Sequence, residues 1–189
     1  MQDWQMLEAA PEIVAPHLLG AVLERELDGE TLRVRIVETE AYHQSDAASH
    51  SYKGRTPRTD VMFGPAGHLY VYFTYGMHYC MNVVTGPEGE GSAVLIRAVE
   101  PLVGEHFMAE NRGGRTGVEL TNGPAKVCQA LGIDKTLNGH DLTHAPLKLV
   151  LSEPLASSDI VQTTRIGISQ AKDVPWRFYL RDNPYVSKP

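Results

Sequence analysis

Hydrophobic and polar positions along the chain predict more short strands than helices. Residues 22–27 alternate in the strand period of two, and Asp28-Gly29 then supplies a typical two-residue hairpin turn. The return strand places Leu32, Val34 and Ile36 on one face, because alternate residues of a strand share a side. The chain therefore begins its fold with a β-hairpin.

Similar patterns continue to the end of the chain. Further strands are predicted at 92–99, 147–151, 165–169 and 178–181, and short helices at 9–18, 101–111 and 121–132. This mixture predicts an α+β fold in which residues 1–189 form a single domain. We expect a curved, mainly antiparallel sheet with flanking helices and a protruding β-hairpin.

That second hairpin is predicted by residues 69–82, LYVYFTYGMHYCMN, and its tip is unusual. Tyr75-Gly76 falls where the turn is expected, whereas hairpin tips usually carry Asn, Asp or Gly. A two-residue turn there would pair Tyr72 with Tyr79 and send Asn82 to the opposite face. Bringing Tyr72 and Asn82 into one pocket therefore requires a bulge or a longer turn.

Residues 45–68 form a long segment rich in Gly, Pro, Ser and Thr, and it carries Lys53, Arg55 and Arg58. Loops of this length in a small domain are often functional.

Composition narrows the classes of function. At 189 residues with 42% hydrophobic positions, the chain has the composition of an ordinary globular domain. A net charge of −6 argues against binding nucleic acid by overall electrostatics, so a DNA-binding function requires a local basic face. No long apolar run or signal-like segment is present, so we expect no membrane association.

The two distant cysteines indicate neither a zinc site nor a disulfide framework, which favours an intracellular location: cytoplasm and nucleoid, or nucleus in a eukaryote.

The return strand offers a candidate general base. If the strand continues, Glu38, Glu40 and Tyr42 extend the face of Leu32, Val34 and Ile36. A carboxylate at the end of such a row is partly desolvated and can accept a proton from water. The alternative interpretation is a strand end whose glutamates are simply solvated.

A metal site is a second interpretation of the same region. Glu38, Glu40, His43 and His50 supply carboxylate and imidazole ligands within a short span, which would suit a metal-dependent hydrolase. Their spacing matches no known metal motif, however, and HExxH is absent.

Five segments occur in the order typical of a known family. They are VETEAY (37–42), HSYKGRTPRTDVMF (50–63), LYVYFTYGMHYCMN (69–82), VLIRAVEP (94–101) and NGPAKVCQALGI (122–133). Together they resemble the alkyladenine family of 3-methyladenine DNA glycosylases, and the similarity runs from about Val22 to Ser187. The resemblance implies a monofunctional enzyme of base excision repair that flips a damaged purine out of duplex DNA. It would hydrolyse the N-glycosidic bond of 3-methyladenine or 7-methylguanine, with deaminated and etheno purines as further candidates, and leave an abasic site.

The same resemblance implies no metal, no cofactor and no obligate protein partner, in a monomer that acts on double-stranded DNA. The remaining alternative is a protein that binds damaged DNA without catalysis.

The resemblance also implies roles for individual residues. Glu40 resembles the general base that activates water, and Arg97 resembles its partner in orienting that water. The carbonyl of Ile166 would be a third ligand of the water. Residues matching the binding site of the flipped base are Tyr42 and Tyr72 as the stacking pair, His50 on the pocket wall, and Asn82 as the group that disfavours unmodified guanine. His50 is also the candidate that would assist the departure of a neutral base.

Contacts with DNA are implied for a further set. Tyr75 matches a wedge that enters the minor groove and fills the gap left by the extruded nucleotide, which explains an aromatic at a hairpin tip. Met62 resembles a second side chain that pushes into the opposite strand. Other expected DNA contacts are Arg55, Thr56, Arg58, Lys126 and Arg165. With Lys53 and Arg97, these basic residues are expected to gather on the face that carries the hairpin.

Overall fold

Strand pairing in the computed structural model, which describes residues 4–188, confirms the predicted α+β class. The described residues form eight strands in one sheet, and each pair of neighbouring strands among them is antiparallel. The order is β3-β4-β5-β2-β1-β6, and β8 adds to β2 and also pairs with β7. The strands are β1 (Val22–Leu27), β2 (Glu30–His43), β3 (Leu69–Thr74), β4 (His78–Val84), β5 (Ser92–Val103), β6 (Leu147–Val150), β7 (Ile160–Thr163) and β8 (Arg177–Leu180).

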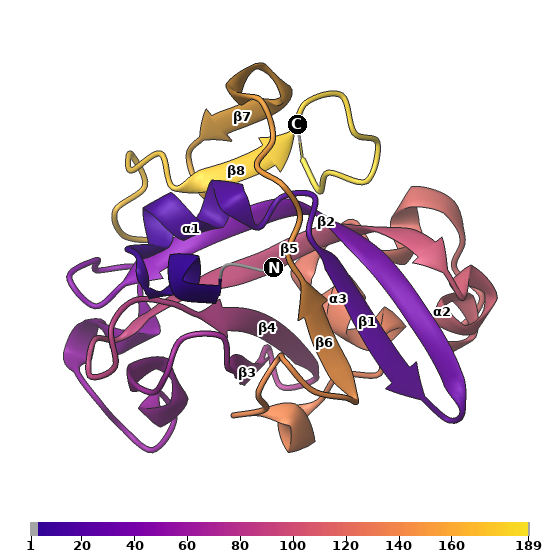
Figure 1. Cartoon of the computed structure of the whole chain (residues 1–189), viewed down its shortest axis with the longest axis horizontal. Coiled ribbons are helices and arrows are strands. Elements are labelled where there is room, and N and C mark those ends of the chain that lie inside the picture. The colour runs from indigo at the N-terminus through magenta and orange to yellow at the C-terminus, as the bar shows by residue number, and fades with distance from the viewer. Residues whose placement is uncertain (1–3, 189) are drawn as a thin grey trace.

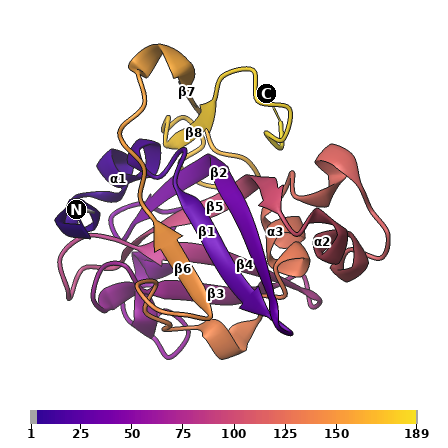
Figure 2. The same cartoon turned by 45° about the vertical axis from the view of Figure 1, so that its right-hand side comes forward.

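Three short α-helices flank the sheet. They are α1 (Pro11–His17), α2 (Glu105–Asn111) and α3 (Pro124–Ala130). Figure 1 shows α1 lying against β2 near β8, with α2 and α3 at the other end of the sheet. Figure 2 shows β1, β2 and β6 in front of the strands of the second hairpin. Among the described residues, no helix has the length and apolar character needed to cross a bilayer.

Local signals explain where most elements begin and end. Asp28 and Gly29 both have positive φ, as a two-residue hairpin turn requires. Pro124 starts α3, and Gly132, with φ of +56°, follows its end.

Two predicted elements were wrong. The helix expected from Pro101 begins instead at Glu105, because β5 continues through Val103 in register with β2 and the left-handed Gly104 ends it. The strand expected at 165–169 is irregular backbone, and the strand of this region is β7, just before it. Residues 165–169 are therefore free to form a wall of a pocket rather than a ladder.

Strand β2 exchanges its two faces midway. Ile36 pairs with Val99 and Thr39 with Ile96, and both partners belong to the main hydrophobic core. The odd spacing from Ile36 to Thr39 shows that an irregularity between them shifts the alternation. The expectation that Glu38, Glu40 and Tyr42 extend the face of Leu32, Val34 and Ile36 was therefore wrong. The irregularity turns the acidic residues away from the core and toward the pocket.

Candidate active site

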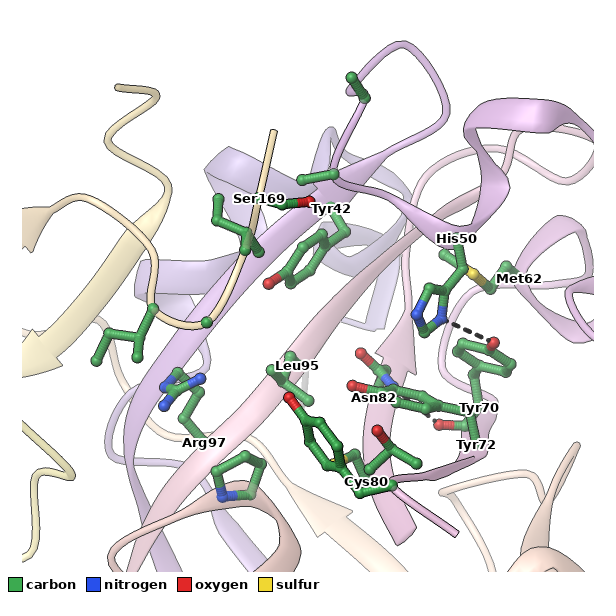
Figure 3. A pocket seen from close by; sticks show the side chains of 18 residues that line it. Tyr42, His50, Met62, Tyr70, Tyr72, Cys80, Asn82, Leu95, Arg97 and Ser169 are labelled. Carbon is green, nitrogen blue, oxygen red and sulfur yellow. Dashed lines mark hydrogen bonds between the residues drawn. The ribbon is translucent and has the colours of Figure 1, made fainter. Parts of the chain in front are cut away.

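A pocket of about 420 Å³ opens between the second hairpin, β2, β5 and the irregular segment 165–169. This volume lies within the usual range for small-ligand sites. Figure 3 shows Tyr42 on one side of the space and His50, Tyr72 and Asn82 on the other. The lining residues are Tyr42, Ala47, Ala48, His50, Met62, Tyr70, Tyr72, Thr74, Tyr75, Cys80, Asn82, Leu95, Arg97, Pro124 and residues 166–169.

The turn of the second hairpin determines which side chains reach this pocket. Thr74 pairs with His78, so three residues rather than two form the turn. Tyr72 consequently pairs with Cys80 and Tyr70 with Asn82, and all four line the pocket. The longer turn thus removes the conflict that a two-residue turn created for Asn82.

Tyr75 occupies the first position of that turn. Its φ is +52°, a conformation uncommon for a large side chain, and 85% of its surface is exposed. Tyr75 also contributes to the pocket lining. The aromatic ring is therefore held in solvent beside the pocket, where it contributes little to the core.

Glu40 lies immediately behind the pocket wall and is fully buried. Its Oε2 accepts a hydrogen bond from the Tyr42 hydroxyl and its Oε1 accepts one from the Ile166 amide, each at 2.7 Å. Arg97 Nη1 lies 3.5 Å from Glu40 Oε1. Tyr42, Ile166 and Arg97 all line the pocket, so these three contacts of the Glu40 carboxylate belong to residues of the pocket wall. The contact from Ile166 to Glu40 is made by its backbone N–H group. The water contact expected of the Ile166 carbonyl stays a prediction.

The aromatic wall combines Tyr42 with the hairpin tyrosines. The Tyr72 and His50 rings are 4.5 Å apart in an edge-to-face arrangement, and Tyr70 lies 5.7 Å from Tyr72. Burial raises the pKa of Tyr42 and of Tyr72 above the usual range, and neighbouring Glu40 adds to the effect. Both hydroxyls therefore remain protonated at neutral pH.

His50 is neutral at physiological pH. Burial of its ring, together with the positive charge of Arg58, lowers the pKa of His50 to about 4. Its Nδ1 shares a hydrogen bond of 3.2 Å with the Tyr70 hydroxyl. An imidazole in this state can offer or accept one hydrogen bond, but it is not a cationic acid.

Asn82 is buried at the base of the hairpin. Its side-chain amide donates to the Tyr70 carbonyl at 3.2 Å, which fixes the side chain within the pocket wall. Asn82 therefore has a fixed position in the pocket lining, and its expected role against unmodified guanine stays a prediction.

Several residues expected at a DNA surface lie elsewhere. Met62 is only 2% exposed and packs with Phe63 and Tyr70 at the pocket wall, so this conformation does not present it to DNA and its expected insertion stays a prediction. Arg165 is also buried, because its guanidinium pairs with Asp46 and donates to the Ala41 carbonyl. Its guanidinium is thus occupied by partners within the protein, and the expected phosphate contact of Arg165 stays a prediction.

The other basic residues differ in their availability. Arg97 is buried, which contradicts the expectation that it would lie on a basic surface. Lys126 pairs with Glu119 at 2.7 Å and Arg55 with Asp60 at 2.5 Å, although Arg55 is largely exposed. Thr56 and Arg58 are exposed, and the Arg58 guanidinium lies 5.7 Å from the Tyr72 ring centre. Among the basic residues expected on the face that carries the hairpin, the exposed ones are Lys53, Arg55 and Arg58, and all three lie in the 53–58 loop.

The metal interpretation lacks geometric support. In the part of the chain that the structure describes, no three His, Cys, Asp or Glu side chains gather in a way that could hold a metal ion. Glu38 and Glu40 both contact Arg97 instead, while His43 bonds to a nearby serine and His50 to Tyr70.

The structure also reveals contacts that the sequence analysis missed. Glu38 was considered in the row of the candidate base and as a metal ligand, yet it pairs with Arg97 and Arg177 and accepts two hydrogen bonds from Ser187. Tyr70 and Cys80 line the pocket, and the alternation of the hairpin could have identified Tyr70 as a neighbour of Tyr72. No spacing in the sequence indicated Arg177 or Ser187.

Comparison with known proteins adds an independent finding. The model of the methylpurine-DNA glycosylase family matches residues 5–184. Curated proteins that carry the provisional name 3-methyladenine DNA glycosylase are also similar. One from Carboxydothermus hydrogenoformans is 59% identical over 93% of both chains. One from Desulfitobacterium hafniense is 52% identical over 93% of this chain and 92% of its own, and one from Methanoculleus marisnigri is 51% identical over the same shares.

Proposed function

This chain belongs to the methylpurine-DNA glycosylase family, and on that premise we propose that it removes methylated purines from duplex DNA. As a member of this family it is a hydrolase of the N-glycosidic bond. The finer proposal is a monofunctional enzyme that acts on 3-methyladenine and 7-methylguanine, with deaminated and etheno purines as further substrates, and that leaves an abasic site. Neither a metal nor a cofactor has a part in the proposed mechanism.

One observation carries this proposal. A fully buried carboxylate, Glu40, stands directly behind an aromatic pocket, and Arg97 lies 3.5 Å from it at the pocket wall. We propose that a purine nucleotide in the pocket places its sugar carbon C1′ next to Glu40 and Arg97. Nucleoside hydrolysis needs a base for water and a negative charge near the developing oxocarbenium ion, and Glu40 can supply both.

The proposed chemical step is a displacement by water. Arg97 orients a water molecule, Glu40 accepts its proton, and the water oxygen bonds to C1′ as the C1′–N bond breaks. The electron pair of that bond stays with the departing purine. A 3- or 7-methylated purine carries a positive charge in DNA, so it departs as a neutral base without a proton from the protein.

Selection of the damaged base would come from the same charge. We propose that the base stacks between Tyr42 and Tyr72, where a cationic ring gains a cation–π attraction of roughly 0.5–2 kcal/mol. Asn82 would crowd the exocyclic amine of unmodified guanine. His50 is not a cationic acid at neutral pH, so its help to a neutral base such as hypoxanthine would be limited to one hydrogen bond.

Duplex DNA would approach across the hairpin tip. We propose that Tyr75 enters the minor groove and replaces the stacking of the flipped nucleotide. Arg55, Thr56 and Arg58 would contact phosphates from the exposed loop, and Lys126 would add a weaker contact because Glu119 already binds it. The role earlier expected of Met62 and Arg165 is not included, since both are buried.

The decisive experiment is incubation with duplexes that contain a single 7-methylguanine, hypoxanthine or ethenoadenine. We expect released free base and alkali-labile sites at the lesion, with an undamaged duplex as the control. Binding without any released base would favour a non-catalytic binder of damaged DNA. Activity should persist in excess EDTA, and loss with chelator followed by recovery with added metal would contradict the proposal.

A further inference from the structure

We propose that Glu38 and Ser187 are positioning residues that hold Arg97 in the orientation the hydrolysis requires. This inference rests on the proposed function of Glu40 and Arg97. It assigns part of the active-site architecture to the segment around Ser187, which lies beyond residues 5–184 matched by the family model.

Glu38 is the centre of a buried network of hydrogen bonds. The carboxylate is fully buried, and its Oε1 accepts from Arg97 Nε at 3.3 Å, from Arg177 Nε at 2.7 Å and from the Ser187 hydroxyl at 2.9 Å. Its Oε2 accepts from the Ser187 amide at 2.7 Å. A carboxylate with four donors cannot itself serve as a free base, so its function must be exerted through its partners.

Arg97 divides its guanidinium among three partners. Its Nε binds Glu38, its Nη2 donates to the Ser187 hydroxyl at 3.4 Å, and its Nη1 faces Glu40 at 3.5 Å. The planar guanidinium has a fixed fork geometry, so two occupied positions determine the direction of the third. Glu38 and Ser187 thereby direct one N–H group of Arg97 toward Glu40.

This arrangement also prevents a closer ion pair. An unrestrained guanidinium beside a carboxylate tends to form two parallel hydrogen bonds. Such a bidentate pair with Glu40 would use the lone pairs that must accept a proton from water. Because Glu38 occupies the Nε side of Arg97, only one arm of the guanidinium can reach Glu40.

The segment that contains Ser187 is itself held in place. Arg177, on β8, binds Glu38 and also donates to the Lys188 carbonyl. Glu38 therefore holds residue 187 against β2, and Arg177 holds residue 188 against β8. The network contains two carboxylates, Glu38 and Glu40, and two guanidiniums, so its charges balance in the buried site.

A structural role alone would predict a different result. If the network only anchored the segment around Ser187, its loss would lower stability while the folded enzyme excised at the normal rate. If it positions Arg97, the rate of the chemical step should fall while affinity for the lesion duplex is retained. Single-turnover kinetics separate these cases, because the rate at saturating enzyme excludes binding and product release.

The test uses Ser187→Ala, because Ser187 is only partly buried and the change keeps the hydrogen bond that its backbone N–H donates to Glu38. We expect the single-turnover rate of 7-methylguanine excision to fall about threefold to tenfold, the range for one lost hydrogen bond. The dissociation constant for the lesion duplex should stay within about twofold. Ser187→Thr keeps a hydroxyl and should restore most of the rate. Ser158→Ala is the matched control, since that exposed hydroxyl bonds only to neighbouring Asp159 in the described structure.

Two further variants strengthen the test. Glu38→Gln should reduce the single-turnover rate about tenfold to a hundredfold, provided that it folds, and Ser187→Ala decides the question if it does not. In an Arg97→Ala background, Ser187→Ala should cause no further loss of rate, because Ser187 acts through Arg97.

A normal rate for folded Ser187→Ala, or an additive loss in the Arg97→Ala background, would overturn the inference while leaving the proposed function intact. A wild-type enzyme that releases no base from any lesion duplex would instead refute the proposed function itself.

Discussion

Replacing Tyr75 with Ala tests the proposed base flipping separately from the chemical step. The ring is 85% exposed, so no more than about 30 Å² of a tyrosine side chain of roughly 200 Å² is buried in the free protein. At about 25 cal/mol per Å², its removal costs at most ~0.8 kcal/mol of folding free energy. For a domain of this size the melting temperature should fall by no more than about 3 °C. The left-handed backbone at this position is no worse for Ala than for Tyr.

The effect on DNA should be much larger. If Tyr75 fills the gap left by the flipped nucleotide, its loss removes a base–aromatic stack of roughly 1–3 kcal/mol. Because about 1.4 kcal/mol corresponds to a factor of ten, the flipped state should become about fivefold to 150-fold less populated. Single-turnover excision from duplex DNA measures this loss directly when flipping limits the rate. Tyr75→Phe keeps the ring and should excise within about threefold of the wild type.

One combination of results would refute this reasoning. The alternative is that Tyr75 folds back onto the protein and supports the hairpin. Tyr75→Ala would then melt well below the wild type, and its folded fraction would excise at the normal rate.

Other changes address other parts of the site. Glu40→Gln should keep lesion binding but lose at least about two orders of magnitude in excision rate, since the amide retains the shape of the side chain without its basicity; normal turnover would place the base elsewhere. Arg165→Ala should lower the free energy of unfolding by about 3–5 kcal/mol in urea titrations, because it leaves Asp46 buried and unpaired. If Arg165 instead served only as a phosphate contact, its loss would weaken DNA binding and leave stability unchanged. His50 should titrate with a pKa near 4 by NMR. Because this pKa is below the unfolded value of about 6.5, the contribution of neutral His50 to folding stability is fully present above about pH 6.5 and is lost as the pH falls toward 4. In Arg58→Ala the pKa of His50 should rise only partway toward 6.5, because burial is the larger cause, and a wild-type pKa near 6.5 would contradict the described pocket.

Much of this architecture follows from local sequence signals. Alternating residues and Asp28-Gly29 predicted the first hairpin, and the tyrosine-rich segment predicted the second. Glu40 and Tyr42 are two residues apart on one strand, so their side chains share a face and bond to each other whichever face that is. The exposed position of Tyr75 was also predictable, because it occupies a turn. These features depend on contacts within a few residues.

Tertiary structure decided the features that depend on parity and on distant partners. One extra residue in the hairpin turn placed Asn82 beside Tyr70, and one irregularity in β2 turned Glu40 toward the pocket. Alternation has a period of two, so a single inserted residue reverses every side chain that follows, and composition does not reveal the insertion. The burial of Met62 and Arg165, and the bond from Ser187 to Glu38 across 149 positions, depend on which surfaces meet in the folded chain. The sequence therefore determined which chemical groups are present, while packing determined which of them face the pocket, the solvent or each other.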